Sequence, residues 1–103
     1  MTVDTVGALE ELRAKLGAID ESLLDHLRRR IECCMEIARV KKAHGGPMMQ
    51  PHRIGIVQNR ATQYGKDHGI NQDFLRSLYD LIIAETCRVE ERVMGKDPDE
   101  RAS

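Results

Sequence analysis

Four basic residues are spaced so that some of them could bind a small anion: Arg13, Arg30, Lys41 and Arg53. An α-helix rises about 1.5 Å and turns about 100° per residue, so Arg30 and Lys41 would lie three turns apart on nearly the same face. Two long side chains about 16 Å apart on that face can converge on one anion between them. The spacing predicts a pocket for a small polyanion.

Arg13 cannot serve the same pocket within its own chain. On a continuous helix it would lie about 25 Å from Arg30 and point about 100° away from it. If Arg13 binds the anion, it therefore binds in the pocket of a second subunit, which predicts a helical homodimer. The alternative is that all these cations lie on solvated helix faces, where basic residues are common.

Length and composition predict one all-α domain. A chain of 103 residues can form a single core, and a partner subunit would help to bury its surface. Hydrophobic residues make up 41% of the chain, but it has only two tyrosines, one phenylalanine and no tryptophan. An aliphatic core of this kind favours helices over a β-sandwich. We expect one domain over residues 1–103, with a loose polar tail at 95–103.

Charge and hydropathy exclude two classes of partner. The formal net charge is −1, which removes the electrostatic argument for nucleic acid binding. The triplet Arg28-Arg29-Arg30 does not form a patch, because successive helical residues point about 100° apart. The apolar runs are short and the N-terminus does not resemble a signal peptide, so we expect no membrane span and a cytoplasmic protein.

The cysteines and histidines predict neither a metal site nor a disulfide framework. Cys33, Cys34 and Cys87 show no Cys-x-x-Cys spacing and have no histidine at ligand distance on the same helix face. We interpret the adjacent Cys33 and Cys34 as small core residues. No metal or cofactor is expected.

A long apolar stripe predicts the first helix. It consists of Leu9, Leu12, Leu16, Ile19, Leu23, Leu27, Ile31, Cys34 and Ala38. Asp4 or Thr5 is the predicted N-cap, and Gly45-Gly46-Pro47 should end the helix. About forty residues span about 60 Å, which exceeds the width of a domain of this size. Such a helix needs a second chain to cover its stripe.

Two shorter helices should follow. Pro51 suits the first turn of a helix that would run towards Gly69, and Asn71 is the predicted cap of the next one. The third helix has a main apolar stripe of Phe74, Leu78, Leu81, Ile82, Val89 and Val93. Beside it lies a row that starts apolar and ends polar: Leu75, Tyr79, Ile83, Thr86 and Glu90. Its polar end either lines a pocket or has reached solvent near the end of the helix.

The ordered set of residues resembles the all-helical chorismate mutases over about residues 9 to 94. The resemblance is carried by Leu12-Arg13, Ile19-Asp20, Leu23-Leu24, Arg30, Lys41, Pro47, Arg53, Ile82-Ile83, Thr86 and Glu90. It implies an intertwined homodimer of three helices per subunit, with two active sites that each use both chains. It also implies a unimolecular [3,3] rearrangement that needs no cofactor.

The resemblance also implies roles for individual residues. Arg30, and Arg13 of the partner subunit, would each hold a substrate carboxylate, and Lys41 would face the breaking ether bond. Glu90 stands where bacterial relatives usually carry a Gln that donates to the ether oxygen, and a carboxyl can donate only while protonated. The implied catalytic residues are Lys41, Glu90 and Arg30. The implied substrate-binding residues are Arg13, Arg30, Lys41, Gln50, Arg53, Ile54, Ile83, Thr86 and Glu90.

The substrate is suggested by departures from the usual pattern. Relatives that act on chorismate usually carry acids at the positions of Gln50 and Ile54, where they meet the C4 hydroxyl. The segments Pro47–Pro51 and Cys87–Glu90, with Val93-Met94, instead resemble the 4-amino-4-deoxychorismate mutases of actinomycete antibiotic pathways. These enzymes make 4-amino-4-deoxyprephenate, a precursor of 4-aminophenylalanine. The expected role of Gln50 is to offer its carbonyl oxygen to the amine.

Three alternatives remain open from the sequence. The first is an ordinary chorismate mutase that makes prephenate for aromatic amino acids. The second is an isochorismate pyruvate lyase, which shares this scaffold and similar cations. The third is a helical dimer that serves as a docking or regulatory module, for which the long apolar stripe alone would suffice.

Overall fold

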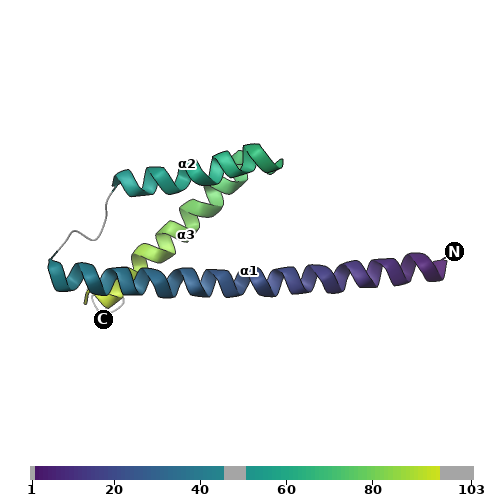
Figure 1. The fold of residues 1–103 in the computed structure, drawn as a ribbon, viewed down its shortest axis with the longest axis horizontal. Coiled ribbons are helices and arrows are strands. Elements are labelled where there is room, and N and C mark those ends of the chain that lie inside the picture. Colours follow the sequence, from purple (N-terminus) through teal and green to yellow (C-terminus); the bar gives the residue numbers. More distant parts are fainter. Residues whose placement is uncertain (1, 46–50, 96–103) are drawn as a thin grey trace, which may run out of the picture. The chain divides into compact units, whose positions relative to one another are not determined.

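The computed structural model of the chain describes residues 2–45 and 51–95, and the side chains of 5–45 and 53–95. They form three helices, α1 (Thr2–His44), α2 (Pro51–His68) and α3 (Gln72–Val93), and no strand (Figure 1). The prediction of an all-α chain with one long, one short and one medium helix is confirmed. The predicted loose tail lies, from residue 96 onward, outside the described residues.

The two ends of α1 differ in how well they were predicted. Gly45, with a φ of 69°, ends the helix in the left-handed conformation that glycine adopts without strain, as predicted. Gly46 and Pro47 lie outside the described residues. The predicted cap at Asp4 or Thr5 is wrong, because α1 begins at Thr2 and both residues lie within it. An acidic residue is also favoured inside a first turn, so residue type alone did not identify the cap.

A tight turn joins α2 to α3. Gly69, with a φ of 73°, ends α2, and the backbone amide of Ile70 donates to the carbonyl of Gly65 at 2.9 Å. Asn71 Oδ1 then accepts from the backbone amide of Phe74 at 2.8 Å, which confirms the predicted cap. Helices α2 and α3 diverge from this turn (Figure 1), and Gln58 Nε2 bridges them by donating to Asp80 Oδ1 at 2.6 Å.

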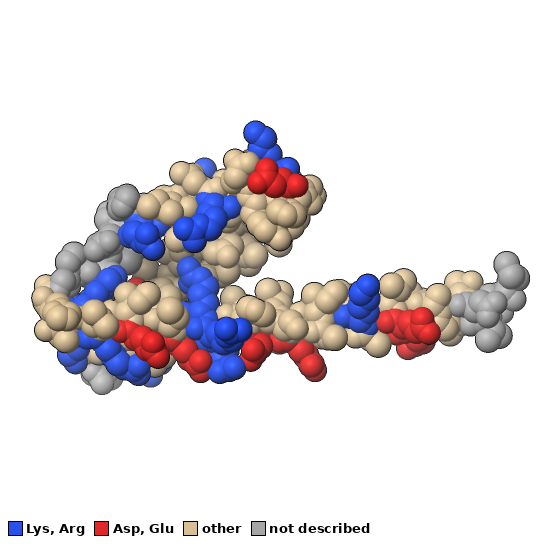
Figure 2. Space-filling model, in the orientation of Figure 1, with Lys and Arg blue, Asp and Glu red and all other residues tan. Residues whose placement is uncertain are grey.

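The chain divides into two compact units after Glu32, within α1. The first unit, Met1–Glu32, contains the N-terminal part of α1, whose apolar stripe is open to solvent in the single chain. Leu12 and Leu16 are 61% and 57% exposed. In Figure 2, uncharged side chains cover much of this part of the helix on the face drawn. This stripe can contribute hydrophobic free energy only if side chains from outside the unit cover it.

The second unit, Cys33–Ser103, contains the end of α1 together with α2 and α3. Its buried residues within the described ranges include Ala38 of α1, Ala61 of α2 and Glu90 of α3. The main stripe predicted for α3 is only partly covered in the single chain, because Phe74 and Leu81 are exposed. The core of this unit therefore consists of small and aliphatic side chains around one buried carboxyl group.

The packing of α2 against the following turn requires a glycine at position 65. An ideal Cβ on Gly65 would lie 2.7 Å from the carbonyl oxygen of Ile70 and 2.9 Å from Cδ1 of Leu75. We expect Gly65→Ala to reduce the free energy of unfolding by about 1–3 kcal/mol, because backbone and a packed side chain must shift. Thermal or urea unfolding followed by circular dichroism measures this change.

Gly55 provides the matched control on the same helix. A Cβ added there would meet nothing within 4 Å. Because alanine is a better helix former, Gly55→Ala should raise the free energy of unfolding by about 0.5–1 kcal/mol. Equal effects of the two substitutions would contradict the close approach at Gly65.

Candidate active site

A buried carboxyl and a lysine meet between the end of α1 and the end of α3. Lys41 Nζ lies 3.8 Å from Glu90 Oε1. Glu90 is only 6% exposed, and the Lys41 side chain is 23% exposed. Of the two interpretations of the polar row on α3, the one in which Glu90 has reached solvent is therefore wrong. α1 covers the end of α3, which the pattern of α3 alone could not indicate.

The same face of α3 carries two further predicted residues. Ile83 and Thr86 precede Glu90 by seven and four positions, so the three residues lie along one side of the helix. Both are half-buried, and Thr86 makes a polar interaction. The structure thus brings Lys41, Thr86 and Glu90 into one compact unit, with an apolar side chain beside them.

The predicted residues of α2 have different environments. Ile54 is half-buried, whereas Arg53 is exposed in the single chain. Gln50 lies outside the described residues. The structure therefore places an apolar residue, Ile54, on α2 at a position where the resemblance expects contact with the substrate.

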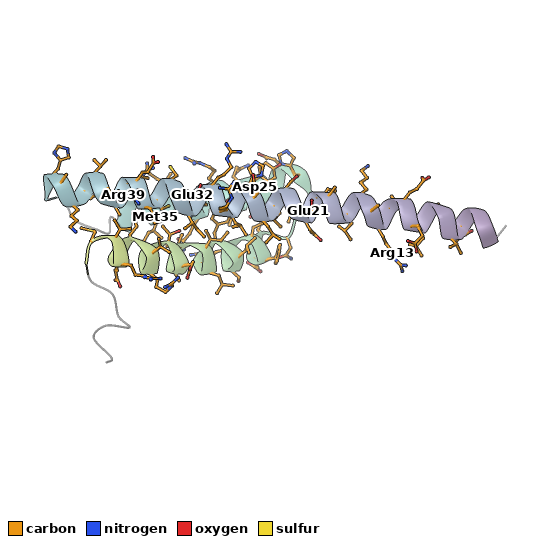
Figure 3. All side chains as sticks on the ribbon, turned by 90° about the horizontal axis from the view of Figure 1, so that it is seen from below. Arg13, Glu21, Asp25, Glu32, Met35 and Arg39 are labelled. Atoms are coloured by element: carbon orange, nitrogen blue, oxygen red, sulfur yellow. The ribbon has the colours of Figure 1, made fainter. Side chains whose placement is uncertain are left out.

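The remaining predicted cations lie on the first unit. Arg13 projects from the N-terminal part of α1 (Figure 3), where its Nη1 atom lies 3.7 Å from Glu10 Oε1. Both of these side chains are largely exposed, so the pair contributes little stability. Arg30 is half-buried and has an interaction partner.

Arg28 has an ordinary structural role on α1. Arg28 lies 2.7 Å from Asp25 and 2.9 Å from Glu32, which precede and follow it by about one helical turn. Its hydrogen bond and charge hold the pKa of the Asp25 carboxyl below its usual value. Arg28 thus belongs to a set of exposed ion pairs along one side of the helix.

Sequence analysis did not identify the thiol of Cys87 as a neighbour of the Lys41–Glu90 pair. Burial raises the pKa of this thiol, the charges of Glu90 and Glu91 raise it further, and Lys41 opposes them. Cys87 therefore stays neutral at a pH where an ordinary thiol begins to ionise. The spacing of Cys87 three positions before Glu90 could have indicated that they are neighbours.

The cysteines of α1 were only partly predicted. Cys34, which is part of the apolar stripe, is half-buried, but Cys33 is exposed, so its interpretation as a core residue is wrong for the single chain. The reason is geometric, since Cys33 lies about 100° around the helix from Cys34. None of the three cysteines, Cys33, Cys34 and Cys87, forms a disulfide.

The described residues also bear on metal binding and on membrane insertion. No group of three or more histidine, cysteine, aspartate or glutamate side chains could hold a metal ion there. Within the same residues, no helix combines the length and hydropathy required to cross a membrane.

Comparison with known proteins identifies the family. A family model described as chorismate mutase type II matches residues 12–91, which contain Arg13, Lys41 and Glu90. The chain belongs to this family. The resemblance seen in the sequence is confirmed, as is the prediction of an isomerase of the chorismate mutase type.

Within the type II chorismate mutases, the chain is similar to two relatives that share one name. The 4-amino-4-deoxychorismate mutase of Streptomyces venezuelae is 53% identical over 89 residues, which is 86% of each chain. The 4-amino-4-deoxychorismate mutase of Streptomyces pristinaespiralis is 53% identical over 83 residues, 81% of this chain and 64% of that protein.

More distant members of the family are larger proteins. The bifunctional chorismate mutase/prephenate dehydratase of Escherichia coli K12 is 28% identical over 83 residues, 81% of this chain but only 22% of that protein. This chain therefore corresponds to less than a quarter of such a protein. No solved structure matches the chain.

Proposed function

We propose that this protein converts 4-amino-4-deoxychorismate to 4-amino-4-deoxyprephenate. The proposal depends chiefly on one observation, the 53% identity over 86% of each chain to a relative named for this substrate. The buried pair of Lys41 and Glu90 supports it, because the pair provides two charged groups at one end of a small helical unit. The product is a precursor of 4-aminophenylalanine and is used in antibiotic biosynthesis.

The reaction rearranges bonds within one molecule. The ether bond between the ring and the enolpyruvyl group breaks while a carbon–carbon bond forms between the enolpyruvyl methylene and the ring. No atom enters or leaves, and nothing is oxidised. As the ether bond stretches, its oxygen gains negative charge, which a nearby cation stabilises more in the transition state than in the bound substrate.

Each predicted residue has a role in this reaction. The ammonium of Lys41 donates to the ether oxygen, and the hydroxyl of Thr86 donates to the ring carboxylate. Arg30, and Arg13 of the partner subunit, bind the two carboxylates, for which the planar guanidinium is well suited. Arg53 supports the pocket. Together these residues hold the substrate in the compact conformer from which the chair-like transition state forms.

The C4 position is surrounded by groups that disfavour a hydroxyl. The half-buried Ile54 leaves a substrate hydroxyl without a partner on that side, which costs binding free energy. Gln50 offers its carbonyl oxygen to the amine, and Ile83 provides an apolar contact from α3. The site is thereby adapted to an amino substituent.

The active unit is a homodimer located in the cytoplasm, in which residues 1–103 of each chain form one domain. The exposed apolar stripe of the first unit supports this proposal, since Leu9, Leu12, Leu16, Ile19 and Leu23 are all between 44% and 61% exposed in the single chain. A second copy of the same stripe is its natural complement in a two-fold symmetric dimer. The dimer places Arg13 in the site of the other chain.

A competition assay tests the proposed substrate. Purified protein is incubated with 4-amino-4-deoxychorismate and chorismate together, and both products are identified and quantified by liquid chromatography with mass detection. We expect the ratio of kcat/KM values to favour the amino substrate by at least about tenfold, the size of effect that one mismatched polar group produces.

Other results would assign the protein to one of the alternatives. A clear preference for chorismate would make it an ordinary chorismate mutase. Release of pyruvate from isochorismate would make it a lyase. If a bicyclic dicarboxylate that mimics the transition state neither binds nor raises the melting temperature, the chain is a docking or regulatory module.

A further inference from the structure

The buried carboxyl of Glu90 lies where the family usually places a donor. Glu90 is 6% exposed, and its Oε1 atom lies 3.8 Å from the ammonium of Lys41. Burial alone would favour the neutral acid, whereas an ammonium at this distance favours the ionised carboxylate. An ionised carboxylate can only accept hydrogen bonds, so in this state Glu90 cannot donate to the ether oxygen of a substrate.

The charge of Glu90 is unfavourable for one part of the reaction and favourable for another. A carboxylate beside the ether oxygen opposes the negative charge that develops there, which leaves Lys41 as the donor. The proposed substrate also carries an ammonium at C4, on the ring carbon next to the one that bears the ether oxygen. In a complex in which Lys41 reaches the ether oxygen, the carboxylate paired with this lysine would lie near the C4 ammonium.

We propose that ionised Glu90 is the negative group that recognises the C4 ammonium and thereby determines the specificity for a 4-amino substrate. This inference rests on the proposed function. It accounts for the absence of acids at Gln50 and Ile54, because a single carboxylate on α3 replaces them. Glu90 then has a binding role in place of the donor role that Gln has in other members.

The charged groups around Glu90 are consistent with this role. Lys41 faces it from α1, and Cys87 and Glu91 lie beside it on α3. The thiol of Cys34 on α1 is close enough to Cys87 to affect its ionisation. On α2, the described titratable side chains are all exposed: Arg53, Arg60, Tyr64, Lys66, Asp67 and His68. Lys41 is the cation that lies 3.8 Å from this carboxylate.

The test compares Glu90→Gln with the wild-type protein on both substrates. The substitution keeps the shape of the side chain, removes its charge and introduces an amide that can donate to the ether oxygen. We expect kcat/KM for 4-amino-4-deoxychorismate to fall at least about tenfold, because a desolvated charge pair is lost. With chorismate, kcat/KM should stay the same or rise. The specificity ratio should therefore move towards chorismate.

The pH profile separates the binding role from a donor role. If ionised Glu90 binds the ammonium, kcat/KM for the amino substrate should not rise as the pH is lowered from 8 to about 5, towards the range where carboxyl groups protonate. If Glu90 has to donate a proton in a hydrogen bond, kcat/KM should rise over the same range. The Glu90→Gln variant should show no such rise in either case.

Two further variants serve as controls. Glu91→Gln removes the neighbouring half-buried carboxylate of α3, and it should leave the specificity ratio unchanged. Glu90→Asp retains the charge on a shorter side chain, and it should keep a preference for the amino substrate that Glu90→Gln loses. Thermal unfolding of all three variants identifies losses that arise from stability alone.

The outcomes distinguish this inference from the proposed function. If the wild-type protein prefers the amino substrate and Glu90→Gln keeps the same ratio, the role of Glu90 is wrong and the proposed function stands. A rise in kcat/KM at low pH for the amino substrate would overturn the role in the same way. If the wild-type protein does not prefer the amino substrate, both proposals fail.

Discussion

Replacing Lys41 with alanine should lower kcat by about 10²–10³-fold, the size of effect seen when a donor to a developing oxyanion is removed. The ammonium of Lys41 is partly shielded from water and lies 3.8 Å from Glu90, at the end of α1 that meets α3. Its interaction with the ether oxygen strengthens as negative charge develops, so the loss should appear mainly in kcat. Steady-state kinetics on 4-amino-4-deoxychorismate measures it.

The Lys41 experiment needs controls for stability and for charge. Lys41→Ala leaves the buried Glu90 carboxylate without this cation, which also destabilises the fold. The double variant Lys41→Ala with Glu90→Gln removes that unbalanced charge, and it should recover stability but not activity. Lys42→Ala alters the next residue, whose side chain is exposed, and should have near-normal turnover. Near-normal turnover of a folded Lys41→Ala variant would exclude the proposed role.

Replacing Arg13 with alanine should reduce kcat/KM by about 100-fold or more, although the residue lies on an exposed part of α1. The reason is that a guanidinium on a carboxylate makes charge-assisted, two-point hydrogen bonds that water cannot reproduce in the closed site. The partner of Arg13 in the single chain is Glu10 at 3.7 Å, an exposed contact worth little. Stability should therefore remain close to that of the wild type.

Lys15 provides the matched control for Arg13. It is an exposed cation two positions further along α1, and it would point about 200° away from Arg13. Lys15→Ala should leave both turnover and the melting temperature unchanged. Similar losses in the two variants would indicate a general effect of charge on this part of the helix.

Local signals in the sequence predicted most of the fold. The side chain of Asn71 can cap a helix, and Gly69, which has no side chain, can end a helix in the left-handed conformation without strain. The structure shows the cap and the helix end at these residues. Residue type likewise predicted the end of α1 at Gly45 and the start of α2 at Pro51. The start of α1 was wrong, because Asp4 and Thr5 are compatible with a first helical turn as well as with a cap.

The site was less predictable because it depends on contacts between helices. Helical spacing placed Thr86 and Glu90 on one face, but burial of Glu90 depends on where the end of α1 lies relative to α3. The same holds for Cys87, whose environment comes from α1 as well as from its own helix. The proposed role of Arg13 depends on contacts with a second chain, which helical spacing within one chain does not encode.

The most direct test of a site shared between two chains is to mix two inactive variants. Arg13→Ala and Lys41→Ala homodimers each have two defective sites, whereas a dimer of one chain of each kind has one intact site. After dissociation and random reassembly of equal amounts, activity should rise to about a quarter of the wild-type value, because half of the dimers are mixed. If activity stays at the level of the separate variants, Arg13 does not act in the site of its partner, and the shared site is wrong.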